Sequence, residues 1–154
     1  MRRCSRRFLP NSTLATPSTR KTTPRRIPHI EALDSLRAAD ITLAVLTNKD
    51  HDAALPLVER FFGQRFAVVQ GALAAFPPKP AVPITRYVLA PARRRAPQRV
   101  LYVGDSNVDV QTGHNAGLLV AGAAWGFRGA TELEAAGADF ILEHPDELIA
   151  LAGA

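Results

Sequence analysis

Three groups of polar residues have the chemistry to hold a phosphate and a divalent cation together. Thr47 follows a short apolar run, and Lys79 lies in a proline-rich loop farther along the chain. Asp105 and Asp109 follow another apolar run and are four residues apart. A hydroxyl and the amides of residues 48–50, at the expected start of a helix, can hold phosphate oxygens. A lysine offsets phosphoryl charge, and two carboxylates bind Mg²⁺ directly or through water, so the set predicts a site for phosphoryl chemistry.

An alternation of helical and strand patterns predicts how these groups are positioned. Continuous apolar runs predict buried parallel strands at 41–46, 66–69, 100–103, 118–124 and 140–142. Segments with helical periodicity separate them, at 29–40, 52–62, 84–89, 108–116, 131–136 and 145–151. This order predicts an α/β fold with helices on both faces of a parallel sheet. Ligands of such folds bind beyond the carboxyl ends of the strands, so the three groups should lie at one edge.

Each group alone has a simpler structural explanation. Thr47 would cap a helix, and Lys79 would be a solvated loop lysine. Asp105 and Asp109 would be acids at a helix N-terminus, where the helix dipole favours them. One shared site explains all three groups in their observed order and spacing, and we therefore prefer it.

The segments that carry these residues resemble motifs of the haloacid dehalogenase superfamily. Residues 103–112, VGDSNVDVQT, continue to an Asn-Ala-Gly at 115–117 and resemble its fourth motif in the form found in phosphoglycolate phosphatases. The sequence AWGFR at 124–128 and the residues up to Leu148 are similar to that subfamily's tail. The segment LAVLTNK resembles the second motif, and Pro78-Lys79-Pro80 resembles the third. The resemblance covers about residues 23–151.

That resemblance implies a fold and a reaction. The fold is a three-layer, Rossmann-like core with a parallel sheet. The reaction is hydrolysis of a phosphate monoester with Mg²⁺ as cofactor, and 2-phosphoglycolate is the favoured substrate. In this family an aspartate attacks phosphorus, and water hydrolyses the resulting aspartyl-phosphate.

The resemblance also implies a role for each matching residue. Thr47, Asn48 and Lys79 would bind the phosphate, and Lys79 would also restrain the nucleophile. Asp105 would be the direct Mg²⁺ ligand. Asp109 would act through water or by hydrogen bonding, with Ser106 in a supporting role.

One part of the family pattern has no match here. The family's first motif is Asp-x-Asp-x-Thr/Val at the end of an apolar strand; its first aspartate is the nucleophile and its second the general acid/base. Asp34 and Asp40 are the only aspartates before Thr47, on an expected helix and turn. The helical cap that follows the first motif is almost wholly unmatched as well. We therefore expect an inactive chain, without the first, central strand, whose flanking strands face a gap unless another chain donates a strand.

The chain divides into a basic segment, 1–28, and a partial hydrolase core, 29–154. The first 26 residues hold eight of the 19 basic residues, none of the 14 acidic ones, and several prolines, so we expect irregular structure there. Three interpretations stay open for this segment: an organellar transit peptide, a basic arm that binds nucleic acid, or the product of a truncated or shifted reading frame.

Composition narrows the remaining function classes. There is no run of 18 apolar residues, so we predict no transmembrane helix. The single cysteine, Cys4, excludes an internal disulfide and fits a reducing cytoplasm. The net charge of +5 arises in the basic segment, so a nucleic-acid-binding function ranks last. The alternative to an enzyme is a non-catalytic module that binds Mg²⁺ and a small phosphorylated metabolite, or a partner protein; the oligomeric state is left open.

Overall fold

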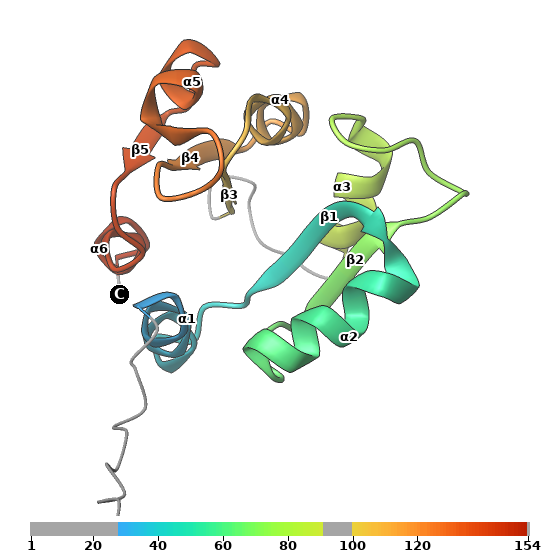
Figure 1. The fold of residues 1–154 in the computed structure, drawn as a ribbon, viewed down its shortest axis with the longest axis horizontal. Helices are drawn as coiled ribbons and strands as arrows, with labels where there is room; N and C mark the ends of the chain where they lie inside the picture. Colours follow the sequence, from blue (N-terminus) through green and yellow to red (C-terminus); the bar gives the residue numbers. More distant parts are fainter. Residues whose placement is uncertain (1–27, 91–99, 154) are drawn as a thin grey trace, which may run out of the picture.

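A computed structural model describes residues 28–90 and 100–153 of the chain. The predictions made for residues 1–27 lie outside this described part. The elements follow one another as α1 (Pro28–Ala38), β1 (Ala44–Asp50), α2 (His51–Phe62), β2 (Val68–Ala72), α3 (Val82–Leu89), β3 (Leu101–Gly104), α4 (Asn107–Asn115), β4 (Leu119–Ala123), α5 (Gly129–Ala135), β5 (Phe140–Leu142) and α6 (Glu147–Leu151) (Figure 1). Every predicted helix and strand is present; β5 has the predicted bounds, and each of the other elements differs from its prediction at one end or both.

The strands form two parallel sheets, and the predicted α/β class is confirmed. β1 pairs with β2, and β3, β4 and β5 pair in that order. Within the described ranges, no hydrogen-bonded pair joins β1 to β3. A continuous sheet is therefore not formed, and the expected gap between the strand that leads to Thr47 and the strand that leads to Asp105 is the boundary between the two sheets.

The strand that carries Thr47 is longer than predicted. Residues 47–50 were expected to break it, but β1 continues to Asp50, with an irregular register between Leu46 and Asp50. The Asp50 carboxylate then accepts a hydrogen bond from Ala53 N at 3.2 Å and caps α2. The amides of residues 48–50 therefore belong to the strand, and the prediction that they begin a helix was wrong.

The second strand was also placed too early, and a glycine explains its true end. β2 extends to Ala72, beyond the predicted end at residue 69, so Gly71 lies within it. A Cβ on Gly71 would lie 2.6 Å from Lys49 O and 2.8 Å from His51 N. Only glycine allows the start of α2 to approach β2 this closely, and this close approach keeps the two strands paired beyond Leu46.

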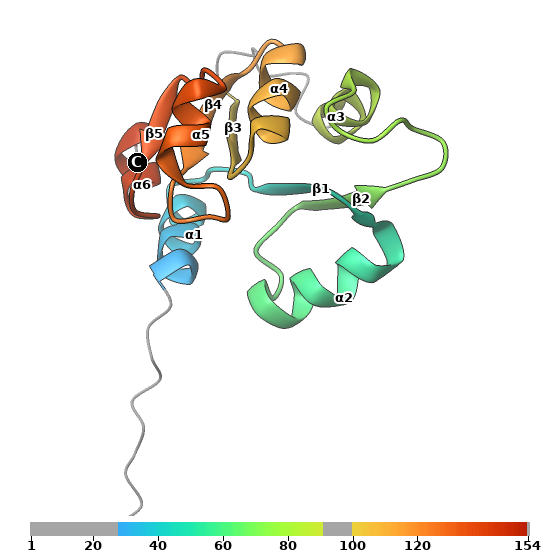
Figure 2. The same cartoon turned by 45° about the horizontal axis from the view of Figure 1, so that its top comes forward.

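The helices pack against the sheets, and the hydrophobic core lies between them. α2 and α3 lie on opposite sides of β1 and β2 (Figure 2). Val110 of α4, Val120 of β4 and Leu133 of α5 are fully buried and form one hydrophobic cluster. Burying each such side chain stabilises the fold by about 1.5–3 kcal/mol. This cluster fixes α4 and α5 on the sheet and so determines where the residues at the start of α4 lie.

No helix in the described part of the chain combines the length and the apolar character needed to cross a membrane.

Candidate functional site

Lys79 and Asp109 meet at the carboxyl ends of β1 and β3. Lys79 Nζ lies 2.6 Å from Asp109 Oδ1, and the two side chains are 10% and 11% exposed. The ammonium group also donates to Leu46 O and to the Tyr102 hydroxyl, each at 3.3 Å. All three Nζ protons therefore have acceptors, drawn from the last regular residue of β1, from β3 and from α4. The molecule has two halves, one with the β1–β2 sheet and one with the β3–β4–β5 sheet. The Lys79 side chain contacts both of them.

The first turn of α4 surrounds the Asp109 carboxylate with donors. Ser106 is the N-cap of this helix, and its Oγ donates to Asp109 Oδ2 at 2.7 Å. The backbone N–H of Asp105 donates to the same oxygen at 3.3 Å. A Cβ on Gly104 would overlap the Asp109 side chain, so the residue before Asp105 has to be glycine. The sequence Gly-Asp-Ser therefore forms a pocket for this carboxylate.

These contacts determine the protonation of the cluster. Burial acts to raise the pKa of Asp109, but hydrogen bonds from Lys79 and Ser106 and the Lys79 charge outweigh it, and its pKa lies below the ordinary value. Burial first, and then the neighbouring Asp109 carboxylate, raise the pKa of the Tyr102 hydroxyl. At neutral pH the cluster therefore contains an ionised Asp109 beside a protonated tyrosine.

Asp105 is held by the loop after β4. Its Oδ2 accepts a hydrogen bond from Phe127 N at 3.0 Å. A Cβ on Gly126 would overlap the Asp105 side chain, so this loop approaches Asp105 only because it has a glycine there. Within the described residues, Asp105 Oδ1 accepts no hydrogen bond, so this oxygen remains available to a ligand.

Asn48 holds the backbone of the loop that carries Lys79. Asn48 Nδ2 donates to Lys79 O at 3.2 Å, and Lys79 N donates to Asn48 Oδ1 at 2.8 Å. From the other half of the molecule, Asn115 Nδ2 donates to Pro80 O at 3.1 Å. Hydrogen bonds from Asn48 and Asn115 thus hold the backbone of residues 79–80 from both halves of the molecule. These bonds determine where the Lys79 ammonium group lies.

The structure brings most of the predicted site residues together. Lys79, Ser106, Asp105 and Asp109 form one hydrogen-bonded cluster, and Asn48 joins it through the loop backbone. Thr47 follows Leu46 directly in β1, and its Oγ1 accepts from Lys49 N at 3.2 Å.

Tyr102 was not predicted as part of the site. Its hydroxyl lies 3.4 Å from Asp109 Oδ1. Its position in an apolar strand could have indicated this role, because a buried tyrosine hydroxyl usually has a polar partner.

The oxygen donors of the cluster suit a hard divalent cation. Asp105 and Asp109 both lie close to the carboxyl ends of the strands, and each side chain accepts a hydrogen bond from a backbone N–H group. Among the residues that the structure describes, no group of three or more His, Cys, Asp or Glu side chains is arranged to hold a metal. Mg²⁺ is commonly held by one or two carboxylates together with water and substrate phosphate, so these residues fit Mg²⁺ better than a cation that needs a full protein cage.

Neither aspartate before Thr47 reaches this site. Asp34 accepts hydrogen bonds from Arg65 Nε at 2.7 Å and from Arg65 Nη2 at 2.9 Å. This ion pair joins α1 to the segment before β2, at the edge opposite the site. Asp40 occupies a turn after α1 with φ of 59°, four residues before β1. The cluster therefore has no further aspartate from the segment that precedes Thr47.

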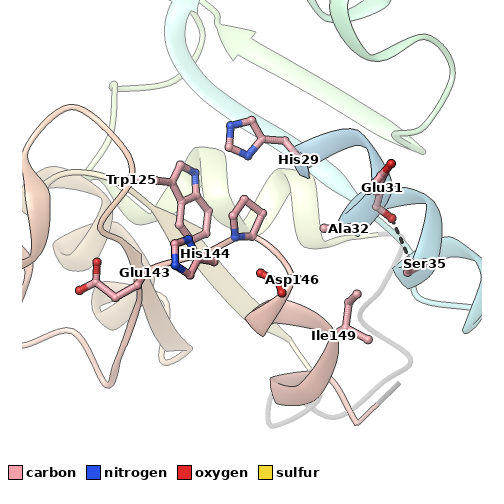
Figure 3. A pocket seen from close by; sticks show the side chains of 10 residues that line it. His29, Glu31, Ala32, Ser35, Trp125, Glu143, His144, Asp146 and Ile149 are labelled. Carbon is pink, nitrogen blue, oxygen red and sulfur yellow. Dashed lines mark hydrogen bonds between the residues drawn. The ribbon is translucent and has the colours of Figure 1, made fainter. Parts of the chain in front are cut away.

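A groove of about 610 Å³ lies elsewhere, between α1 and the segment that leads into α6 (Figure 3). His29 and Ala32 line it from α1, and His144 and Ile149 line it from the C-terminal side. The His29 ring stacks on Trp125 with 6.0 Å between ring centroids. The groove contains none of the predicted phosphate or metal residues, so it is separate from the Lys79–Asp109 cluster.

Comparisons of this chain with a family model and with known proteins point to the same family. Residues 15–123 match the family model of the haloacid dehalogenase-like hydrolases. The pyrophosphatase PpaX of Bacillus velezensis is 33% identical over 124 residues, which are 80% of this chain and 57% of that protein. The phosphoglycolate phosphatase of Escherichia coli K12 is 30% identical over 128 residues, 82% of this chain and 50% of that protein. The chain thus spans between half and three fifths of the length of these two relatives.

Solved structures agree with this result. A predicted phosphoglycolate phosphatase from Haemophilus somnus superposes with a TM-score of 0.69 at 28% identity, over 79% of this chain and 54% of that one. A haloacid dehalogenase-superfamily hydrolase from Geobacter sulfurreducens superposes with a TM-score of 0.63 at 28% identity, over 81% of this chain and 54% of that one. From its family match, its relatives and its fold, the chain belongs to the haloacid dehalogenase-like hydrolases and is similar to their phosphoglycolate phosphatases.

Proposed function

We propose that this chain is the phosphate- and Mg²⁺-holding part of a phosphate monoester hydrolase of the phosphoglycolate phosphatase type. The observation that carries the proposal is the convergence of Lys79, Asp105 and Asp109 at the carboxyl ends of strands from two sheets. The two fixed carboxylates supply negative charge for a metal ion, and the lysine beside them supplies positive charge for a phosphate. Its substrate would be a small phosphorylated metabolite, with 2-phosphoglycolate favoured, and its site of action the cytoplasm.

Each residue of the cluster has a defined task in this proposal. Asp105, whose Oδ1 accepts no hydrogen bond from the residues that the structure describes, and Asp109 would hold Mg²⁺, which when bound supplies positive charge opposite the phosphoryl oxygens. Lys79 keeps Asp109 ionised and adds charge near the phosphate. Its three protons already have acceptors, so it acts mainly through charge and position. Thr47 and Asn48 would contact phosphate oxygens beside it.

The same observations favour an inactive chain when it is alone. Asp34 is paired with Arg65 and Asp40 lies in a turn, so neither can serve as the nucleophile that the family reaction requires. A non-catalytic module that binds Mg²⁺ and phosphate is therefore the second candidate. The two candidates differ in one respect: a hydrolase core would turn over substrate once a suitable carboxylate is supplied, and a binding module would not.

The first test measures phosphate release and Mg²⁺ binding by the full chain. We expect no Mg²⁺-dependent release from 2-phosphoglycolate, and calorimetric Mg²⁺ binding that inorganic phosphate strengthens. Asp105→Asn should weaken this binding, whereas Asp146→Asn, a carboxylate on the groove of Figure 3, should not. Equal Mg²⁺ affinity in the wild type and Asp105→Asn would refute the site. Mg²⁺-dependent phosphate release by the wild type that is lost in Asp105→Asn would show that this chain contains its own nucleophile.

A further inference from the structure

We propose that the Tyr102 hydroxyl weakens phosphate binding at the candidate site, because it occupies a proton of the Lys79 ammonium group. Tyr102 is then a positioning residue, which acts on phosphate through Lys79. This inference rests on the proposed function, since it takes Lys79 as the residue beside the phosphate. It adds a residue that sets how tightly the site holds phosphate, the product that a phosphatase has to release after each reaction.

The first observation is that every proton of the Lys79 ammonium group has an acceptor. Lys79 Nζ lies 2.6 Å from Asp109 Oδ1, and it lies 3.3 Å from both Leu46 O and the Tyr102 hydroxyl oxygen. An ammonium group has three donors and no acceptor. A phosphate oxygen that approaches Lys79 therefore has to compete with one of these three acceptors for a proton.

The three acceptors differ in how easily they give up Lys79. Asp109 is charged and forms the shortest bond, and with 11% of its side chain exposed it would be left as a nearly buried charge without its main partner. Leu46 O is a backbone carbonyl, which can only accept. The Tyr102 hydroxyl both donates and accepts, and it still has Asp109 Oδ1 as a partner at 3.4 Å if it loses Lys79. Tyr102 is therefore the acceptor that phosphate would displace.

Packing holds the Tyr102 hydroxyl in this competing position. The ring packs against the hydrophobic cluster that α4, β4 and α5 share. A Cβ on Gly113 of α4 would lie 3.1 Å from Tyr102 Cβ, so this glycine lets the helix lie close to the tyrosine. Burial raises the pKa of the hydroxyl, which therefore keeps its proton and donates it to Asp109. Its oxygen lone pairs remain for Lys79.

Tyr102→Phe isolates the hydroxyl from the rest of the side chain. The Lys79 ammonium group lies 5.9 Å from the centroid of the Tyr102 ring, and phenylalanine keeps this ring. The substitution removes one acceptor, so one Lys79 proton becomes available to phosphate. Asp109 keeps its bonds from Lys79 and Ser106, and Mg²⁺ affinity should therefore stay close to that of the wild type.

The test measures binding of inorganic phosphate to the full chain by isothermal titration calorimetry at a saturating Mg²⁺ concentration. Tyr102→Phe should bind phosphate about twofold to tenfold more tightly than the wild type, the value of one competing hydrogen bond. Tyr87→Phe is the matched control, because it removes the hydroxyl of a half-exposed tyrosine on α3 whose ring packs on Phe76. The control should bind phosphate as the wild type does.

Stability separates this role from a merely structural one. Urea denaturation should show that Tyr102→Phe is less stable than the wild type, because the bonds to Lys79 and Asp109 are lost. A purely structural tyrosine would lower stability and phosphate affinity together. The proposal requires the opposite signs, lower stability with tighter phosphate binding.

Nuclear magnetic resonance of the lysine ammonium groups tests the bond itself in the wild type and needs no phosphate. The chain has three lysines, Lys21, Lys49 and Lys79, so lysine-to-arginine substitutions assign their signals. The Lys79 protons should exchange with water more slowly than those of the exposed Lys49, and Tyr102→Phe should accelerate this exchange. If Tyr102→Phe fails to fold, Lys79 protons that exchange as fast as those of Lys49 would still overturn the proposal.

The outcomes distinguish this inference from the proposed function. Phosphate binding that is equal or weaker in Tyr102→Phe would overturn the role of Tyr102 and leave the phosphate site in place. Equally tighter binding in Tyr87→Phe would also overturn it, because the effect would not be specific to the Lys79 partner. A wild type that binds no phosphate in the presence of Mg²⁺ would refute the proposed function, and this inference with it.

Discussion

The Lys79 ammonium and the Asp109 carboxylate form a nearly buried ion pair, 2.6 Å apart, between the loop after β2 and the first turn of α4. The pair is completed by Ser106, Tyr102 and the Asp105 backbone, so each charge has several partners. Removing one member of such a pair leaves the other charge buried without its main partner. The pair therefore stabilises the fold as well as shaping the site.

Lys79→Met should reduce the free energy of unfolding by about 3 kcal/mol, because Asp109 would keep its charge without a cation. Urea denaturation of the full chain measures this loss. Lys79→Met combined with Asp109→Asn should lose less than the sum of the single losses, by about 1–3 kcal/mol. Additive losses would show that the ion pair contributes nothing to stability.

The Asp109 pKa predicts how stability depends on pH. Its pKa is lowered in the folded protein, so the unfolded chain binds the proton more readily. The stabilisation is complete above the unfolded value of about 4 and is lost as pH falls through the lowered folded pKa. Denaturation midpoints between neutral pH and about pH 3 should therefore fall more steeply in the wild type than in Asp109→Asn. Parallel curves for the two proteins would contradict this.

Asn48→Ala should loosen the loop that carries Lys79 without changing any charge. Both backbone groups of Lys79 lose their partner, at a cost of about 1 kcal/mol in the free energy of unfolding. Amide exchange at Lys79 should become faster. Ser35→Ala, which removes an exposed hydroxyl bonded to Glu31 O on α1, is the control and should leave that exchange rate unchanged.

Gly126→Ala should displace Asp105, because the added Cβ overlaps that side chain. We expect weaker Mg²⁺ binding, measured by calorimetry. Gly137→Ala is the matched control: its φ of 83° makes alanine strained, but nothing lies within 4 Å of the new Cβ. The control should cost about 1 kcal/mol of stability and leave Mg²⁺ affinity intact. A similar loss of Mg²⁺ affinity in both variants would mean that Gly126 has no specific role.

Leu133→Ala should destabilise the half that contains β3, β4 and β5 by about 3 kcal/mol, because the side chain is fully buried against Gly122 and Ile141. Leu119→Ala, at a half-exposed position in β4, should cost less than about 1 kcal/mol. Thermal unfolding followed by circular dichroism compares the two. Equal losses would show that the Val110–Val120–Leu133 cluster is not the core of this half.

The sequence predicted the order of elements well, because apolar runs and helical periodicity are local signals. The ends of elements were less predictable where tertiary contacts decide them. Residues 47–50 resemble a break, yet pairing of Asp50 with Ala72 extends β1 to the start of α2. α6 begins at Glu147, two residues after the expected Pro145. For β1 the deciding contact comes from a residue distant in sequence. For α6, the Glu147 carboxylate accepts hydrogen bonds from the N–H groups of Glu143 and His144, just before the helix.

The candidate site was predictable in its charged residues and not in its supporting ones. The spacing of Asp105 and Asp109 was informative because a strand-to-helix turn brings both to one edge. The roles of Gly104 and Gly126 depend on close approach of two segments, which no local pattern reveals. The same holds for His51, whose Nδ1 accepts a hydrogen bond from Gly71 N at 3.2 Å and helps to hold β1 against β2.

The strands of each sheet come from one continuous stretch of chain, β1 and β2 from residues 44–72 and β3 to β5 from residues 101–142. Strand pairing in either half therefore closes only short loops, and each half can gain its sheet before the other is complete. The ion pair between Lys79 and Asp109 is different, because its two members belong to different halves. The candidate site is therefore complete only when both halves are folded and in contact.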